Sequence, residues 1–372
     1  MTIQSERLFE PIKIGDVTLK HRVVMAPMTR LRADNETAAP SAMSIAYYAQ
    51  RASDGGLIIS EGTVPSVEGR GWPNSPGIWS TEQIDAWKKI TDAVHAKKGT
   101  IFCQLFAAGR VANPSIAPVI YAPSDINDPT PGAPTPPLKV MTREDITKSI
   151  ADFTQGAKNA IAAGFDGVEI HCANGYLLDQ FIQYNSNQRS DEYGGSLENR
   201  FRFPLQVISS ISSAIGASKV GVRISPFATF QGMRPSDPLA VFIPFTRAVL
   251  SSTPGLAYIS GLMPRANGAD DQANLVENDA LDPIRDIVVV TGVTFFVAGG
   301  FTTQSAKGHA EKHNDLIAFG RYFTSNPDLP QRIRNDWPLV KYDRDTFYTP
   351  GKEGYLDWTE YKAIHQFDAV YP

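Results

Sequence analysis

The sequence predicts an α/β fold, a single (β/α)8 barrel, and three observations carry this prediction. A chain of 372 residues has the length of one such barrel. Eight short apolar runs recur along it, as expected for parallel strands buried on both faces. Most of the gaps between these runs have helical patterns. The predicted strands are residues 22–27, 57–62, 100–105, 167–171, 220–225, 256–260, 294–299 and 315–320. We therefore expect one domain, residues 1–372.

The helical patterns are clearest after the second and third strands. Residues 81–96 and 142–163 each combine a helical apolar period with good helix-forming residues. Thr142 and the acidic residues that follow it suit a helix start, and Gly164 lies where a C-cap glycine belongs. Both segments therefore fit the α half of a β/α unit.

Two segments lie outside the repeating units. Residues 12–19 place a Gly-Asp turn between apolar residues, which predicts an N-terminal β-hairpin that closes the bottom of the barrel. Residues 113–138 contain eight prolines, a density that excludes a helix or a central strand. This Pro-rich excursion follows strand 3, on the face where barrels build active sites, so it is either a lid or a plain surface loop.

The composition excludes several classes of protein. Thirty-five basic and 39 acidic residues give a net charge of −4, which argues against a nucleic-acid partner. Two cysteines cannot form a disulfide framework, a four-cysteine zinc site or an iron–sulfur cluster, and we expect no metal. No signal peptide and no membrane-spanning run is recognisable, so the expected location is cytoplasmic with no membrane partner.

The C-terminal ends of barrel strands hold the active site, so the residues there are the candidates. The last two predicted strands end in Gly299, Gly300 and Gly320, followed by Arg321. Small residues let backbone N–H groups approach a phosphate, and an arginine adds a fixed charge with bidentate reach. Glycine also ends strands for steric reasons, so the pattern favours a phosphate-bearing ligand without requiring one.

The fourth strand ends in a group of polar residues. His171 and Asn174 can both donate hydrogen bonds to one carbonyl oxygen, and Tyr176 is a nearby proton donor. The alternative for His171 is a purely structural role. A nucleophilic pair of His171 and Cys172 is disfavoured because neighbours on a strand face opposite sides.

At this point the sequence resembles the Old Yellow Enzyme family, whose members are FMN-dependent ene-reductases with a (β/α)8 barrel. The resemblance covers nearly the whole chain, with ten motifs in the family's order. They are MAPMTR (25–30), PGIWS (76–80), CQLF (103–106), GFDGVEIHCANGYLLDQF (164–181), GGSLENRFRF (194–203), GVRISP (221–226), AGGF (298–301), AFGRYF (318–323), NPDLP (326–330) and GYLDW (354–358). The details look most similar to fungal members in secondary metabolism, including ergot-alkaloid aldehyde reductases.

The resemblance implies a role for each matching residue. The flavin ring of a tightly but non-covalently bound FMN would be held by Pro27, Met28, Thr29, Gly62, Gln104 and Arg223. Its phosphate would be bound by Gly299, Gly300, Gly320 and Arg321. The substrate would contact His171, Asn174, Phe106 and Tyr355. NADPH would supply hydride through the flavin to the β-carbon, and Tyr176 would protonate the α-carbon.

The resemblance therefore implies a reductase of α,β-unsaturated aldehydes or ketones, active as a monomer or homodimer. Two alternatives stay open: a pathway-dedicated isomerase or desaturase on the same scaffold, and a flavin-binding protein without turnover. Because many family members have Trp where this chain has Phe106, we expect a roomier pocket. Cys172 stands where a small residue is common, and the sequence offers no account of it.

Overall fold

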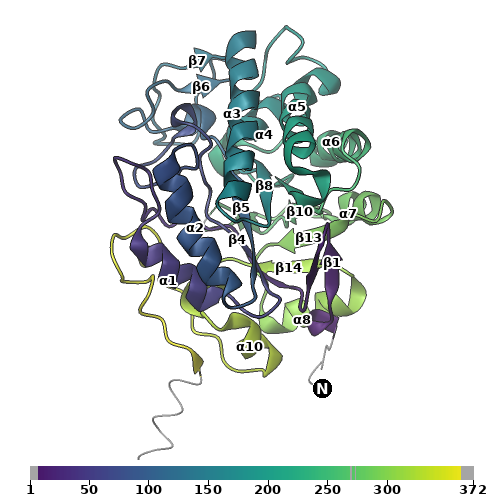
Figure 1. Ribbon diagram of the computed structural model, residues 1–372. Helices are drawn as coiled ribbons and strands as arrows, with labels where there is room; N and C mark the ends of the chain where they lie inside the picture. Colours follow the sequence, from purple (N-terminus) through teal and green to yellow (C-terminus); the bar gives the residue numbers. More distant parts are fainter. Residues whose placement is uncertain (1–6, 269, 273, 362–372) are drawn as a thin grey trace, which may run out of the picture.

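Eight parallel strands form a closed barrel, as the sequence predicted. The structure, a computed structural model, describes residues 7–268, 270–272 and 274–361 (Figure 1). The strands follow one another around the barrel in the order β10-β13-β14-β3-β4-β5-β8-β9. Their bounds are β3 Val23–Met25, β4 Leu57–Ile59, β5 Thr100–Leu105, β8 Gly167–Cys172, β9 Val220–Ile224, β10 Tyr258–Leu262, β13 Thr294–Ala298 and β14 Leu316–Phe319.

Helices follow the barrel strands and cover the outside of the barrel (Figure 1). The α-helices are α1 Ala42–Arg51, α2 Thr81–His95, α3 Arg143–Ala162, α4 Leu177–Ile182, α5 Leu197–Ile215, α6 Pro238–Ser252, α7 Asp282–Val289, α8 Thr303–Lys312, α9 Arg321–Ser325 and α10 Leu329–Arg334. Short 3-10 turns are η1 Arg7–Phe9, η2 Val67–Gly69, η3 Gly109–Val111, η4 Ala217–Lys219, η5 Phe230–Gly232 and η6 Arg344–Thr346. Within the described part of the chain, none of these helices combines the length and apolar composition of a bilayer span.

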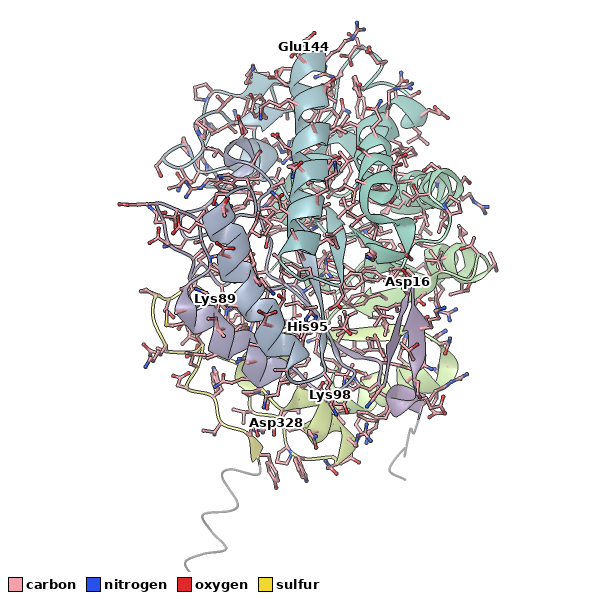
Figure 2. The ribbon with its side chains drawn as sticks, viewed as in Figure 1. Asp16, Lys89, His95, Lys98, Glu144 and Asp328 are labelled. Atoms are coloured by element: carbon pink, nitrogen blue, oxygen red, sulfur yellow. The ribbon has the colours of Figure 1, made fainter. Side chains whose placement is uncertain are left out.

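The two clearest predicted helices are confirmed, together with the signals that bound them. At the start of α3, the Thr142 hydroxyl accepts from the Asp145 backbone N–H, and the Asp145 carboxylate accepts in return from the Thr142 N–H. Gly164, just past its end, has φ +88°, a conformation that favours glycine. Figure 2 labels Glu144, in the first turn of α3, at the top of the view, and His95, the last residue of α2, below the centre. Helix starts therefore lie at the end of the barrel where the strands finish.

One strand begins later than the apolar pattern predicted. The pattern placed it at residues 256–260, whereas β10 spans Tyr258–Leu262. Leu256 and Ala257 are buried, but pairing to both neighbouring strands starts at Tyr258, opposite Gly221 and Thr294. Burial in the chain entering the barrel therefore extended the apolar run beyond the strand itself.

The predicted hairpin is present and lies at the N-terminal ends of the strands. Strands β1 (Ile12–Ile14) and β2 (Val17–Leu19) pair antiparallel. At their turn, labelled in Figure 2, the Asp16 carboxylate accepts a hydrogen bond from the Ser218 hydroxyl, just before β9. The Thr294 hydroxyl at the start of β13 donates to the Lys13 carbonyl (3.0 Å). These contacts seal the end of the barrel opposite the candidate site.

The Pro-rich excursion contains almost no regular structure, as its composition predicted. Its one strand, β6 (Tyr121–Ala122), pairs with β7 (Lys139–Val140) at the upper left of Figure 1. Ala117 and Ile120 pack in a small apolar cluster with Phe106, and Tyr176 borders that cluster. The excursion thus supports the side chains behind one wall of the candidate site, and none of its residues lines the cavity described next.

Candidate active site

A cavity of about 270 Å³ opens where the barrel strands end. Side chains from seven of the eight strand ends or the turns after them line it, as expected for an active site in this fold. Twelve of the fifteen predicted site residues are among them. They are Pro27, Met28, Thr29, Gln104, His171, Asn174, Tyr176, Arg223, Gly299, Gly300, Gly320 and Arg321.

One end of the cavity has the features of a phosphate site. Gly299 has φ +147° and Gly300 has φ +72°, and a Cβ at 299 would lie 2.6 Å from the Cβ of Met263. These positions therefore need glycine, and they leave the backbone open to a ligand. Arg321 donates from Nη2 to Asp271 (2.6 Å), whereas its buried Nη1 has no hydrogen-bond partner among the described residues. A free guanidinium donor beside bare backbone fits a phosphate group.

The opposite part of the cavity carries the other predicted cofactor residues. Gln104, at the end of β5, is held by a hydrogen bond from its Nε2 to Glu169 (2.8 Å). Arg223 on β9 donates from Nη1 to the Ser260 hydroxyl (3.4 Å), and its Nε has no partner among the described residues. An amide and a guanidinium at the cavity wall fit the polar edge of a flavin ring, whose reduced form gathers negative charge.

His171 and Asn174 both present unsatisfied polar atoms at the cavity. His171 Nδ1 and Asn174 Oδ1 have no hydrogen-bond partner among the residues that the structure describes. Burial, and next the positive charge of Arg223, hold the pKa of His171 well below its ordinary value, so the imidazole is neutral at pH 7. Asn174 has φ +59°, and its backbone N–H donates to the Ser225 hydroxyl (2.7 Å), which fixes the turn after β8.

Tyr176 lies on the same turn, directly before α4. Its ring centroid is 5.0 Å from that of His171, in an edge-to-face arrangement. Burial, and next the electrostatic interaction with the Tyr348 phenol, raise the pKa of Tyr176, so the phenol keeps its proton at neutral pH. The turn is anchored from below by Asp179, whose carboxylate accepts from the Gly175 N–H (2.9 Å). The geometry therefore presents a neutral imidazole, an amide and a protonated phenol to one space.

Asp179 makes the stability of this turn depend on pH. Burial raises the pKa of Asp179 to about 7, against about 4 in an unfolded chain. The folded state therefore binds the extra proton between pH 4 and 7, so its stability falls as the pH rises through that window and levels off above it.

Replacing Asp179 with asparagine should remove this pH-dependent penalty. We expect the free energy of unfolding of Asp179→Asn, relative to the native chain, to improve between pH 4.5 and 8 by on the order of a few kcal/mol. Urea titrations at several pH values measure this difference. Parallel stability curves for the two proteins across the window would contradict it.

Gly62 and Phe106 lie beside the cavity rather than on its wall. Phe106 is buried, stacked against Trp72 at 6.2 Å and edge-to-face with Tyr176 at 5.3 Å between ring centroids. A Cβ on Gly62 would come within 2.9 Å of the Phe106 ring, so this glycine makes room for that ring. Phe106 is therefore not among the residues that line this cavity, and its ring packs against that of Tyr176, which does line it.

Tyr355, predicted to contact the substrate, is likewise not among the residues that line the cavity. Tyr355 is fully buried outside the cavity, stacked on Tyr47 with ring centroids 4.0 Å apart. The guanidinium of Arg32 lies 4.4 Å from the centre of the Tyr355 ring. The ring of Tyr355 thus packs on Tyr47 and Arg32 and holds the C-terminal segment against them. A tyrosine seven positions earlier, Tyr348, lines the cavity instead.

Several cavity residues escaped sequence reasoning because they do not follow a barrel strand directly. Tyr348 and Tyr342 come from the segment after α10, and Phe230 comes from η5. Asp270 belongs to the hairpin formed by β11 (Ala266–Asn267) and β12 (Asp270–Asp271). No strand-end pattern marks these positions. By contrast, Cys172 is buried outside the cavity, so it does not pair with His171 there, as the alternation along the strand predicted.

Comparison with known proteins agrees with this geometry. Residues 7–339 match the NADH:flavin oxidoreductase / NADH oxidase family. The chain is 42% identical to the flavin oxidoreductase hxnT of Emericella nidulans, over 95% of this chain and 97% of the relative. It is 44% identical to the chanoclavine-I aldehyde reductase fgaOx3 of Penicillium roqueforti, over 95% and 96%.

Plant proteins and a solved bacterial structure are similar too. The 12-oxophytodienoate reductase 2 of Arabidopsis thaliana is 40% identical over 97% of this chain and 96% of that protein. The structure of the Old Yellow Enzyme homologue from Zymomonas mobilis gives a TM-score of 0.87 at 38% identity, over 95% of this chain and 99% of that one. The phosphate site at Gly299, Gly300 and Arg321 and the polar side chains of Gln104 and Arg223 fit the cofactor of this family. The chain therefore belongs to the Old Yellow Enzyme family and is an FMN-dependent NADH:flavin oxidoreductase of that type.

Proposed function

We propose that this enzyme is an ene-reductase that reduces the C=C bond of α,β-unsaturated aldehydes or ketones at the expense of NADPH. The observation that carries the proposal is the single cavity lined by His171, Asn174 and Tyr176 together with the residues that fit FMN. A carbonyl-binding pair and a proton donor are the groups that reduction of an activated double bond needs.

In this proposal the barrel holds the cofactor from both ends. Arg321 and the backbone at Gly299 and Gly300 bind the phosphate, and Gln104 and Arg223 bind the polar edge of the ring. Pro27, Met28 and Thr29, just after the first barrel strand, line the same cavity and would border the ring. The bound FMN would supply the hydride carrier that links NADPH to the β-carbon of the substrate.

His171 and Asn174 bind and polarise the substrate carbonyl. Because the imidazole is neutral at pH 7, it donates one hydrogen bond without carrying a full charge. The Asn174 amide supplies a second donor to the same oxygen. Two donors at one oxygen stabilise the negative charge that develops there as hydride reaches the β-carbon.

Tyr176 completes the reduction by donating its phenolic proton to the α-carbon. Its pKa is raised by burial, so the proton is present at neutral pH and moves only to the strongly basic carbon of the developing enolate. The tyrosine reloads from solvent after each turnover, since the cavity is open.

The names of relatives support a reductase and the choice of NADPH. Two of them are called reductases of an aldehyde and of an oxophytodienoate. A third, 42% identical over 95% of this chain and 96% of that protein, is called the NADP-dependent oxidoreductase lnbE of Aspergillus flavus. A donor that carries a phosphate on its ribose is therefore the first to test.

The experiment that tests the proposal is a stoichiometry. The purified enzyme with FMN is incubated anaerobically with NADPH and 2-cyclohexenone, and both NADPH oxidation and cyclohexanone formation are followed. We expect one NADPH to be consumed for each saturated ketone formed. An isomerised product without NADPH consumption, or NADPH oxidation without any saturated product, would contradict a reductase.

A further inference from the structure

Glu169 is a buried carboxylate beneath the candidate site, and the reduction scheme gives it no role. It lies on β8 two residues before His171, and its exposed fraction is zero. Because residues i and i+2 of a strand face the same side, Glu169 and His171 both point into the barrel. Glu169 is not part of the cavity wall, so it lies one layer deeper. A carboxylate in this position needs an explanation, since burying an ionised group is costly.

Its neighbours come from the strands on either side. The Gln104 amide donates from Nε2 to Glu169 Oε1 (2.8 Å), while Oε2 has no hydrogen-bond partner among the described residues. In the β8–β9–β10 register, Gly221 lies between Glu169 and Tyr258. A Cβ at 221 would come within 2.2 Å of the Tyr258 ring, so the glycine lets that ring extend over it. Glu169 thus lies between the amide of Gln104 on one side and the phenol of Tyr258 on the other.

The carboxylate also determines how Gln104 is oriented. The Gln104 amide turns its NH2 group toward Glu169, the orientation that an ionised carboxylate, which only accepts hydrogen bonds, requires. The carbonyl oxygen of Gln104 then lies on the other side, 3.5 Å from an ideal Cβ position on Gly62. Gln104 therefore offers its acceptor away from Glu169, where a ring N–H can use it.

The positive charge that faces Glu169 is that of Arg223 on the neighbouring strand. Burial raises the pKa of Glu169, and the Arg223 charge acts against that rise. Burial lowers the pKa of Arg223, and the charge of Glu169 acts against that fall. Each group therefore stabilises the ionised form of the other in a part of the barrel with little water. His171, on the cavity side, is neutral and adds no charge to the pair.

We propose that Glu169 is a positioning residue that offsets the charge of Arg223 and fixes the Gln104 amide, and thereby sets the reduction potential of the bound flavin. The inference rests on the proposed contacts of Gln104 and Arg223 with the ring edge. A negative charge below that edge opposes the gain of electrons by the ring. Glu169 therefore holds the potential low, which makes the reduced flavin a stronger hydride donor to the substrate.

The test is the reduction potential of the FMN-loaded enzyme, measured by equilibration with a reference dye. Glu169→Gln removes the charge at nearly constant shape, and its potential should move to a more positive value while FMN stays bound. Glu169→Asp keeps the charge and should return the potential toward the native value. An unchanged potential in Glu169→Gln, or equal shifts in the two variants, would overturn the proposal.

A matched control separates this effect from the loss of any buried carboxylate. Asp315 is also fully buried, directly before β14 at the other end of the barrel, where it accepts hydrogen bonds from Arg285 (2.9 Å) and pairs with His309. The potential of Asp315→Asn should stay at the native value. If the potential of Asp315→Asn shifted as much as that of Glu169→Gln, the effect would not depend on where the carboxylate lies relative to the ring. That result would overturn the proposal.

If the native chain bound no FMN, the cofactor site itself would fail, whereas FMN binding with an unchanged potential in Glu169→Gln defeats only the role of Glu169.

Discussion

Replacing Tyr176 with phenylalanine is expected to slow reoxidation of the reduced enzyme by an enone by about 10²- to 10⁴-fold, the usual worth of a positioned general acid. The substitution removes the hydroxyl group and keeps the ring that packs edge-to-face on His171 and Phe106. The shape of the site should therefore survive, and only the proton donor is lost.

The two half-reactions provide the control within one protein. Reduction of the flavin by NADPH needs no proton from Tyr176, so its rate in Tyr176→Phe should stay within a few-fold of the native rate. Anaerobic stopped-flow mixing, first with NADPH and then with 2-cyclohexenone, follows both rates in the flavin band. Equal loss in both half-reactions, or in neither, would remove Tyr176 from the proton-transfer step.

Replacing Arg321 with alanine is expected to weaken FMN binding by about 10- to 100-fold. A hydrogen bond to a charged group contributes roughly 1.5–3 kcal/mol, and each 1.4 kcal/mol is tenfold in affinity. Arg321→Lys keeps the charge but loses the fork of two donors, so it should fall between the native chain and alanine. Titration of the apoprotein with FMN, followed by quenching of flavin fluorescence, gives the affinities.

The neighbouring Asp271 should move FMN affinity in the opposite direction. Its carboxylate accepts from Arg321 Nη2 at 2.6 Å and also forms an ion pair with Arg265 at 3.3 Å. A phosphate at this arginine shares the guanidinium with that negative charge, so Asp271→Asn should tighten FMN binding.

The result that would contradict the phosphate site concerns Arg321 itself. If Arg321→Ala bound FMN as tightly as the native chain, the phosphate would be held elsewhere.

The barrel could be predicted because a strand that is buried on both faces has a nearly continuous apolar sequence. Residues 100–105 are apolar except for Thr100 and Gln104, and β5 has those bounds, with every residue buried. The candidate residues then followed from the fold, because the C-terminal ends of the strands border one shared space and alternate residues such as His171 face it. Polar residues at strand ends indicated a functional site because apolar packing of the barrel does not require polar side chains there.

The remaining site residues could not be predicted because they reach the cavity by packing rather than by strand position. Tyr348 and Tyr355 lie in one irregular segment, seven positions apart. The stack of Tyr355 on Tyr47, beside Arg30 and Arg32, decides which of the two tyrosines is left to line the cavity. Such a choice depends on contacts between distant parts of the chain, and no local pattern records it.

The most direct test of the central claim is the visible spectrum of the purified protein, held without oxygen. The account predicts a yellow flavin band that bleaches on addition of NADPH and returns on addition of 2-cyclohexenone. The band and its two changes would establish the cofactor, the electron donor and the class of acceptor in one sample. The absence of a bound flavin band even after incubation with FMN, or a bleached band that no enone restores, would contradict the account.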